Sequence, residues 1–164
     1  MITWEQTFIK IAELFAQRSS CVKRKVGAIL AKDKRILSSG YNGTPSGFVN
    51  CNKVFESGDL KNGVLVKKHG NKIHNITLEK ITHHDFAERY EIHAEQNCLA
   101  YAARNGVNTE GCDIYVTTAP CAQCAKLIIA AGIKKVYYKE TYKNSDGLSL
   151  LNDANIEVIQ VGEK

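Results

Sequence analysis

Two short stretches of the sequence carry side chains that suit metal chemistry, His93-Ala94-Glu95 and Pro120-Cys121-Ala122-Gln123-Cys124. One imidazole and two thiolates form a ligand set that zinc prefers. A structural zinc site uses four protein ligands, whereas a catalytic site uses three and keeps a fourth position for water. Glu95 follows His93 by two residues, within reach of such a water, and is not needed as a ligand. The stretches therefore predict a catalytic zinc on His93 and the two cysteines, with Glu95 as the proton carrier.

Both stretches are expected to begin helices. The run after Glu95 is rich in helix formers and stops at Asn105-Gly106, which predicts a helix over 93–105. Pro120 suits the first turn of a helix and Gly132 suits its end, so a second helix is expected over 121–131. The partial positive charge at helix N-termini favours thiolate over thiol.

Neither motif is informative alone, because a lone C-x-x-C or H-x-E arises by chance or as half of a structural zinc site. Here the two motifs are separated by a strand-like segment, 113–117. Together they match H-x-E followed by P-C-x-x-C, the signature of zinc-dependent deaminases. A non-enzymatic zinc-binding module is the weaker interpretation, since it leaves Glu95 unexplained.

The composition is that of a globular protein. The chain has 164 residues, 44% hydrophobic and 24% charged, which predicts a single domain over 1–164. No signal peptide or membrane-spanning run is apparent, so we expect a cytoplasmic protein, in the host cytoplasm if the source is viral, with six reduced cysteines. The net charge of +5 suits a phosphorylated substrate but is also ordinary for a solvated surface.

The first half of the chain predicts a helix, a hairpin and an irregular insertion. Apolar residues at helical spacing predict a helix from Trp4 to about 18–20, followed by strands over 26–31 and 35–40. The loop 40–47 holds three glycines and leaves a strand end, where α/β folds bind ligands, although an ordinary surface turn would look similar. Residues from about 52 to 84 are polar and are expected to form an insertion with one short helix.

The second half alternates strands and helices. Strands are expected over 113–117, 134–138 and 156–161, with a further helix over about 145–154. This order is typical of parallel strands in a buried sheet. We therefore predict the α/β class, as a three-layer α/β/α sandwich with a five-stranded mixed sheet.

Over nearly its whole length the chain resembles the deoxycytidylate (dCMP) deaminases of the cytidine deaminase-like superfamily, including the phage members. The resemblance rests on five segments, 25–28, 40–47, 92–95, 102–106 and 120–124. Free-cytidine deaminases usually have cysteine at the position of His93, and riboflavin-pathway deaminases space their cysteines more widely. RNA adenosine deaminases are the closest alternative, because they share both zinc motifs.

The resemblance implies hydrolysis of dCMP to dUMP and ammonia, which would supply dUMP for dTMP synthesis. The alternative is a polynucleotide deaminase acting on tRNA adenosine or single-stranded DNA cytosine. It predicts stacking aromatics beside the pocket, but only 8% of the residues are aromatic and most fall in apparent core segments. We therefore expect no nucleic acid partner, and since no apolar run approaches the length of a membrane span we expect no membrane partner either.

By resemblance, Asn42 should bind the sugar or base, and the Ala94 and Cys121 peptide groups should face the pyrimidine. The residues expected to meet the 5′-phosphate are Lys25 and Tyr142, with Lys23 or Arg24 nearby, although these lysines could equally be solvated.

A second, structural zinc is also implied by the resemblance to phage dCMP deaminases, with ligands Cys21, Cys51, His83 and Glu91. These positions are scattered in sequence, so their spacing alone does not make a site. His84 is the alternative imidazole. The other interpretation is two buried cysteines and two surface polar residues.

Many enzymes of this kind are hexamers that dCTP activates and dTTP inhibits. The resemblance thus implies a homo-oligomer and a regulatory triphosphate site, where Mg2+ could accompany the nucleotide. Its residues would be Gly40, Tyr41 and Gly43 in the glycine loop, and Arg104 near a subunit contact. Arg104 could equally be an exposed cation at a helix end.

Overall fold

The computed structural model describes residues 1–55, 64–66 and 79–162. The chain divides into two compact units. The first unit comprises residues 1–19, 25–42 and 93–164, and the second comprises residues 20–24 and 43–92. The assignment of a single domain over 1–164 stays a prediction.

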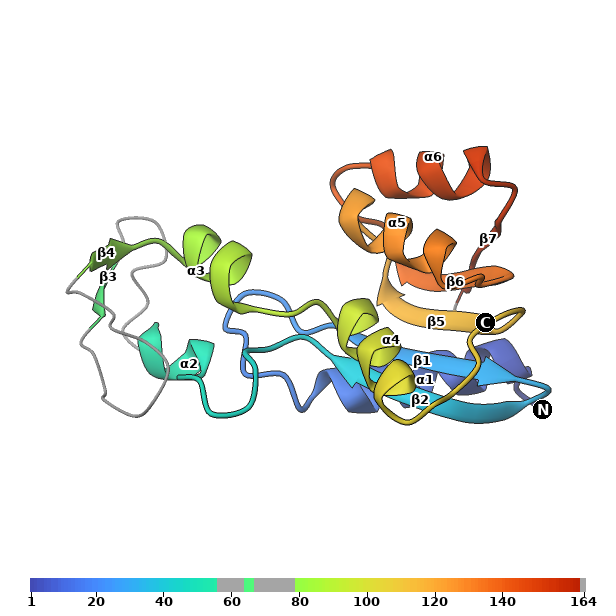
Figure 1. Ribbon diagram of the computed structural model, residues 1–164, viewed down its shortest axis with the longest axis horizontal. Coiled ribbons are helices and arrows are strands. Elements are labelled where there is room, and N and C mark those ends of the chain that lie inside the picture. Colours follow the sequence, from blue (N-terminus) through green and yellow to red (C-terminus); the bar gives the residue numbers. More distant parts are fainter. Residues whose placement is uncertain (56–63, 67–78, 163–164) are drawn as a thin grey trace. The chain divides into compact units, whose positions relative to one another are not determined.

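A five-stranded mixed sheet forms the centre of the first unit (Figure 1). Its strands lie in the order β2-β1-β5-β6-β7. β1 is antiparallel to both β2 and β5, whereas β5, β6 and β7 run parallel. The predicted five-stranded mixed sheet is therefore confirmed. The strands are β1 (Gly27–Lys32), β2 (Arg35–Tyr41), β5 (Asp113–Thr118), β6 (Lys135–Glu140) and β7 (Glu157–Gln160).

A two-residue turn joins β1 to β2. Lys32 pairs with Arg35, and the residues between them, Asp33 and Lys34, have φ values of 50° and 60°. Positive φ at both central positions is the pattern of a type I′ hairpin turn, whose twist matches that of the flanking strands. The hairpin expected from the strands over 26–31 and 35–40 is therefore present.

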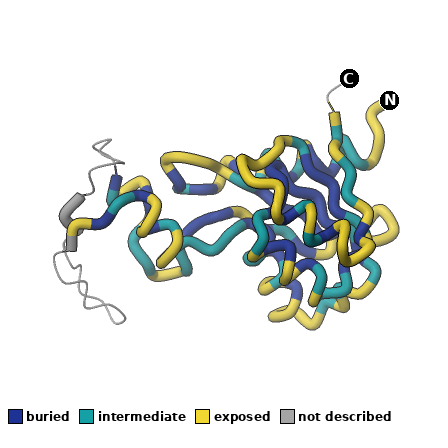
Figure 2. The backbone as a smooth tube through the Cα atoms, turned by 90° about the horizontal axis from the view of Figure 1, so that it is seen from above, coloured by how far each residue is buried: buried dark blue, intermediate teal, exposed yellow. Residues whose placement is uncertain are grey.

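The alternation of side chains along the strands builds two cores, one on each face of the sheet. Ile29 and Tyr115 pack with Phe8 of helix α1 (Trp4–Ala16) on one face. Leu30 and Ile114 belong to the core on the other face, which the other three helices of the unit complete. Figure 2 shows the buried backbone between these layers in dark blue. The three helices are α4 (Ala94–Arg104), α5 (Ala122–Ala130) and α6 (Asp146–Asp153).

The expected elements of the second half agree with the structure to within two residues at each end. The helices expected over 93–105, 121–131 and about 145–154 each begin one residue later and end one residue earlier. α1 ends at Ala16, before the expected 18–20. Among the described residues, no helix combines the length and the apolar character that crossing a membrane requires.

The second unit is small and is built around its own core of Cys21, Cys51, Phe55, Ile81 and Phe86. It contains α2 (Cys51–Val54), α3 (His83–Tyr90) and the paired strands β3 (Val64–Val66) and β4 (Glu79–Ile81). Part of the expected insertion, 56–63 and 67–78, lies outside the described residues.

α3 is a helix that the sequence analysis did not predict. Its N-cap is Thr82, whose hydroxyl oxygen accepts a hydrogen bond from the Asp85 amide at 3.2 Å. The helix buries only His83 and Phe86, and most of its residues are polar or charged, so it offers few apolar residues as a signal. The sequence signal for this helix is Thr82 followed three residues later by Asp85, the pattern of a helix N-terminus.

Candidate active site

The first residues of α4 and α5 carry the two sequence motifs. His93 and Cys121 are the N-cap residues of α4 and α5, and both have extended backbone conformations, with ψ values of 157° and 170°. Cys121 follows closely on the carboxyl end of β5, and Cys124 lies in the first turn of α5. Both helix N-termini therefore direct partial positive charge toward this region.

The three predicted ligand atoms converge. His93 Nδ1 lies 3.5 Å from Cys121 Sγ and 3.3 Å from Cys124 Sγ. All three ligand atoms lie within 4.8 Å of one another. In a tetrahedral zinc site, bond lengths of about 2.0–2.3 Å place neighbouring nitrogen and sulfur ligands roughly 3.5 Å apart. The arrangement therefore fits a zinc ion held by one imidazole and two thiolates.

Glu95 lies next to this group but outside the converging set of ligand atoms. It is 4% exposed, and burial raises the pKa of its carboxyl above the usual value. The nearby His93 imidazole works in the opposite direction and favours the charged form. A buried carboxyl beside a metal site, and not needed as a ligand, can accept and return protons.

The pKa values of the two cysteine thiols shift in opposite directions. The hydrogen bond with Cys124 lowers the pKa of the Cys121 thiol to about 3, against the effect of burial, and His93 lowers it further. The pKa of Cys124 is raised, first by that same hydrogen bond and then by burial. One thiol of the pair therefore ionises readily, and a bound metal cation would favour ionisation of both.

Side chains from α4 and β2 hold the start of α4 in place. The carboxamide oxygen of Gln96 accepts a hydrogen bond from the His93 amide at 2.9 Å. The Asn97 side chain donates to the Tyr41 carbonyl at 2.8 Å, and the Ser38 hydroxyl donates to the Cys98 carbonyl at 2.8 Å. The sequence analysis did not identify these three residues. Gln96 was detectable, since glutamine three residues after an N-cap is a capping signal.

Asn42 is fixed beside β1 within the first unit. The Asn42 side-chain oxygen accepts a hydrogen bond from the Val26 backbone amide at 2.8 Å, and the Asn42 backbone amide donates one to the Val26 carbonyl at 3.2 Å. Asn42 is 7% exposed, and Ala94 is fully buried at the start of α4. Lys25 and Tyr142 are exposed residues of the first unit, whereas Lys23 and Arg24 belong to the second. The substrate-binding roles of these residues stay predictions.

The residues assigned to regulation fall in three places. Gly40 and Tyr41 end β2, and Arg104 is the exposed last residue of α4. Gly43 belongs to the second unit, where it forms a short bridge with Ile92. Their regulatory role stays a prediction.

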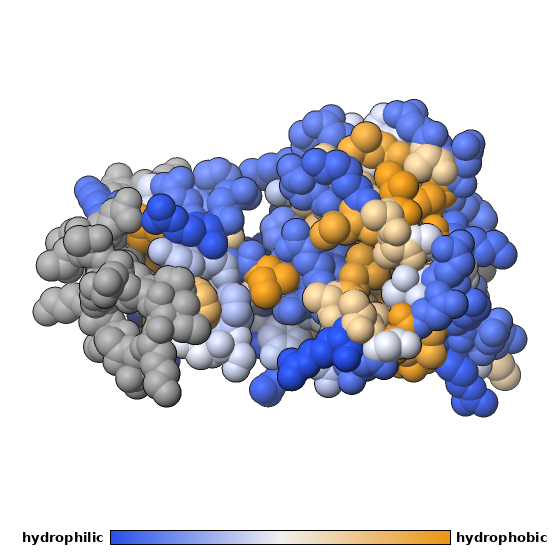
Figure 3. Space-filling view, in the orientation of Figure 1, coloured by the Kyte–Doolittle hydropathy of each residue, from blue (hydrophilic) through white to orange (hydrophobic). Residues whose placement is uncertain are grey.

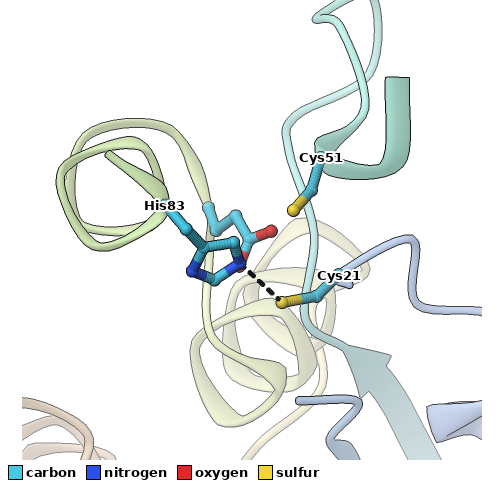
Figure 4. A group of neighbouring side chains, drawn as sticks. Cys21, Cys51 and His83 are labelled. Carbon is cyan, nitrogen blue, oxygen red and sulfur yellow. Dashed lines mark hydrogen bonds between the residues drawn. The ribbon is translucent and has the colours of Figure 1, made fainter. Parts of the chain in front are cut away.

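A second group of ligand atoms lies entirely within the second unit (Figure 4). Cys21 Sγ lies 3.5 Å from His83 Nε2, and the three labelled side chains in the figure point toward one another. His83 is 5% exposed, whereas the neighbouring His84 is exposed and outside the group. The four members, whose ligand atoms lie within 4.8 Å of one another, are Cys21, Cys51, His83 and Glu91.

In the second group, too, the pKa values of the two thiols shift in opposite directions. The hydrogen bond with Cys51 lowers the pKa of Cys21 to about 4, and burial opposes this shift. The pKa of Cys51 is raised by the same hydrogen bond and by burial. The structure thus brings together the residues of both predicted ligand sets.

Comparison with known proteins places these features in a family. The family model that describes the cytidine and deoxycytidylate deaminase zinc-binding region matches residues 2–140 of this chain. The chain is 42% identical to the deoxycytidylate deaminase of Enterobacteria phage T4, over 96% of this chain and 90% of that protein. It is 37% identical to ComE operon protein 2 of Bacillus subtilis, over 98% of this chain and 72% of that protein.

A solved structure extends the comparison. The chain is similar to the dCMP deaminase of cyanophage S-TIM5, whose crystal structure was determined in complex with dCMP and dUMP. The two share 34% sequence identity with a TM-score of 0.72, and the match covers 96% of each chain.

The unequal ionisation of the cysteine pair predicts a distinctive reactivity. In protein freed of metal by a chelator, iodoacetamide should modify Cys121 almost equally fast at pH 8 and pH 6, because its pKa of about 3 keeps it a thiolate at both. An ordinary thiol with a pKa of about 8.5 would slow by roughly 80-fold over that range. Peptide mass spectrometry would locate the modification, and added zinc should suppress it.

Buried Cys98 serves as the internal control, because burial raises its pKa to about 12 and it should stay unmodified. A Cys121→Ser protein should lose the pH-independent reaction in the peptide that contains residue 121, whereas Cys21, whose pKa is also lowered, is followed in its own peptide. The assignment is wrong if the modification of Cys121 slows between pH 8 and pH 6 as an ordinary thiol would.

Proposed function

The chain belongs to the cytidine and deoxycytidylate deaminase family, and from that premise we propose that it hydrolyses dCMP to dUMP and ammonia, supplying dUMP for dTMP synthesis. The observation that carries the proposal is the convergence of His93, Cys121 and Cys124 beside a buried carboxyl that is not part of their set. Relatives named deoxycytidylate deaminase and the cyanophage complex support the choice of dCMP as substrate.

The metal would be zinc, held by His93, Cys121 and Cys124. The donor set fits, because imidazole and thiolate are zinc ligands and their atoms already stand at tetrahedral spacing. When bound there, zinc lowers the pKa of water to about 7 and so provides a nucleophile near neutral pH.

Glu95 would move the protons of the reaction. Its carboxylate takes a proton from the attacking water and delivers it to ring nitrogen 3, which makes carbon 4 electrophilic. Hydroxide adds to carbon 4, Glu95 takes the remaining hydroxyl proton and passes it to the amino group, and the bond from carbon 4 to that nitrogen breaks, so that dCMP and water yield dUMP and ammonia. One side chain acting as base and then as acid needs a pKa near the working pH, and the burial of Glu95 shifts its pKa in that direction.

The substrate would be held by residues around the start of α4. Asn42 would bind the sugar or base, and the peptide groups of Ala94 and Cys121 would face the pyrimidine. The position of Asn42 is well defined, because two hydrogen bonds join it to Val26. The phosphate would meet Lys25 and Tyr142, with Lys23 or Arg24 nearby, since cations and hydroxyl donors suit phosphate oxygens.

A substrate panel tests both the reaction and the phosphate contacts. The protein should release ammonia from dCMP and far less from deoxycytidine, tRNA or single-stranded DNA. Lys25→Gln and Tyr142→Phe should each lower kcat/KM for dCMP by about 10- to 100-fold, the effect of losing a charged hydrogen bond. Neither variant should change turnover of deoxycytidine, and Lys10→Gln on the exposed side of α1 is the control.

Preference for a polynucleotide would overturn the proposal in favour of a polynucleotide deaminase. If the two variants impair dCMP and deoxycytidine equally, the phosphate role is wrong.

The role of Glu95 is tested by removing its carboxylate. Glu95→Gln should lower kcat for dCMP by roughly 10²–10⁴-fold, the usual value of general acid–base catalysis. Its zinc content should stay equal to that of the unaltered protein, because Glu95 is not among the converging ligand atoms. Glu88→Gln, at an exposed position of α3, is the matched control. A zinc-replete Glu95→Gln protein with near-normal turnover would remove Glu95 from the mechanism.

We further propose a second, structural zinc on Cys21, Cys51, His83 and Glu91. The support is that four protein ligands complete a closed tetrahedral site and that their atoms lie within 4.8 Å of one another. Such an ion would join the segment 20–24, α2 and α3 within a unit whose apolar core is small.

Metal analysis should find two zinc ions per chain. The double variant Cys51→Ser/His83→Ala should retain one ion and unfold at a lower temperature, because metal binding contributes to the stability of such sites. The control is His84→Ala, which changes the exposed neighbouring imidazole and should keep both ions. One zinc ion per unaltered chain would rule out the second site.

Regulation and assembly are proposed from the family resemblance. The site for dCTP as activator and dTTP as inhibitor, with Mg2+ on the triphosphate, would use Gly40, Tyr41, Gly43 and Arg104. A dCMP saturation curve that dCTP leaves unchanged would exclude this regulation. The protein would act in the cytoplasm.

We propose a homo-oligomer, with a hexamer as the expected size. Figure 3 shows apolar side chains at the surface of the first unit over α4 and α5. Large side chains of these two helices that are exposed include Tyr101, at 58%, and Leu127, at 44%. Apolar patches of this kind often mark contacts between proteins. A monomer in sedimentation experiments would exclude the oligomer.

A further inference from the structure

The start of α4 rests on a glycine of β2. A Cβ atom placed on Gly40 would lie 2.3 Å from the Ala94 carbonyl oxygen and 2.5 Å from the Cys98 amide nitrogen. These two atoms are four residues apart in α4, so they form the pair that an α-helix joins by a hydrogen bond in its first turn. The backbone of β2 thus lies directly against the turn that follows His93.

The start of α5 rests on a second glycine, which comes from α6. A Cβ atom on Gly147 would lie 2.0 Å from the Pro120 carbonyl oxygen and 2.8 Å from the Cys121 carbonyl carbon. Pro120 is fully buried, so it has little room to move away. The backbone of α6 therefore lies directly against the peptide that leads into the ligand Cys121.

Neither glycine is required by its own backbone conformation. Gly40 lies in a strand and Gly147 in a helix, and neither has a positive φ. A glycine within a helix or strand lowers the stability of the folded protein relative to an alanine, because glycine loses more conformational freedom on folding. Close approach of the neighbouring backbone is the structural reason for glycine at both positions.

We propose that Gly40 and Gly147 are positioning residues for the metal centre, which set the distance between the imidazole of His93 and the thiols of α5. The inference rests on the zinc site of the proposed function. Gly40 fixes the turn that carries His93 and Glu95, and Gly147 fixes the peptide of Cys121 from a different element. Added volume at either glycine moves one half of the ligand set relative to the other.

Gly27 provides a matched control. A Cβ atom on Gly27 would lie 1.9 Å from the Ala12 carbonyl oxygen and 2.8 Å from the Ala16 amide nitrogen, both in α1. The conflict is as severe as at Gly147, but α1 carries none of the proposed ligands. Gly27→Ala therefore measures the general cost of forcing two backbones apart in this unit.

The experiment uses the full chain with Co2+ in place of zinc, because cobalt absorption reports the geometry of its thiolate and imidazole ligands. The spectrum of a Cys121→Ser/Cys124→Ser protein is subtracted, which leaves the signal of the three-ligand site. Gly147→Ala and Gly40→Ala should shift the ligand-field bands and weaken zinc binding, measured by chelator competition, by roughly 10- to 100-fold. Gly27→Ala should lower the unfolding temperature but keep the bands and the affinity.

The outcomes separate the positioning role from the site itself. If the unaltered protein gives no difference spectrum, the three-ligand site is absent and both proposals fail. If it gives one and Gly147→Ala matches Gly27→Ala in bands and affinity, only the positioning role is wrong.

A further variant covers the case in which Gly147→Ala does not fold. Leu148→Ala, beside the same contact, removes packing of α6 against the core without creating a clash. It should weaken zinc binding in the same direction. An unchanged affinity in that variant overturns the positioning role.

Discussion

The distance between the first turns of α4 and α5 is the constraint on which the chemistry of the first unit depends. For one zinc ion to bind all three ligand atoms, the distance from His93 Nδ1 to each cysteine sulfur must be shorter than two metal–ligand bond lengths added together. The observed distances are 3.5 Å to Cys121 Sγ and 3.3 Å to Cys124 Sγ. The parallel pairing of β5 with β6 brings the chain back across the sheet and leaves the start of α5 at the carboxyl end of β5. Ligand sites of α/β sheets commonly form at such strand ends. The end of β5 therefore positions Cys121 and Cys124, and the packing of α4 on β1 and β2 positions His93.

The charges at this place favour a bound cation. Two thiols and the buried carboxyl of Glu95 surround a single imidazole, and like charges in a buried site cannot all ionise together. The hydrogen bond between the two thiols is the first cause of the opposite shifts in the pKa of Cys121 and Cys124, and burial is the first cause of the raised pKa of Glu95. A divalent cation would favour the ionised form of both thiols and leave the carboxyl as the group that exchanges protons. The same unequal pair recurs at Cys21 and Cys51.

Much of this arrangement follows from patterns that are local in the sequence. The alternation of strands and helices after residue 93 predicts the parallel part of the sheet, and the stop signals at Asn105-Gly106 and Gly132 predict the ends of α4 and α5 to within one residue. Pro120 and the cysteine spacing predict the start of α5, because a helix places residues three apart on one face. The group of His93, Cys121 and Cys124 was identifiable for this reason, since each half is carried by one short segment.

Contacts between distant segments were harder to predict. Cys21, Cys51, His83 and Glu91 lie far apart in sequence, and only family resemblance suggested that they meet. His83 rather than His84 joins that group because His83 lies on the buried side of α3 and His84 on the exposed side. The sequence analysis missed this helix because most of its residues are polar. The close contact of Gly147 with Pro120 has no local signal, because the need for glycine there comes from a neighbouring element.

The most direct test of the proposed zinc site is a crystal structure of the zinc-loaded protein with anomalous diffraction measured at the zinc absorption edge. We expect an ion bound by His93 Nδ1, Cys121 Sγ and Cys124 Sγ, with the Glu95 carboxylate beside it but not bonded to it. An ion that takes Glu95 as its fourth protein ligand would contradict this expectation, because the site would then be closed and structural. So would the absence of an ion between these three residues.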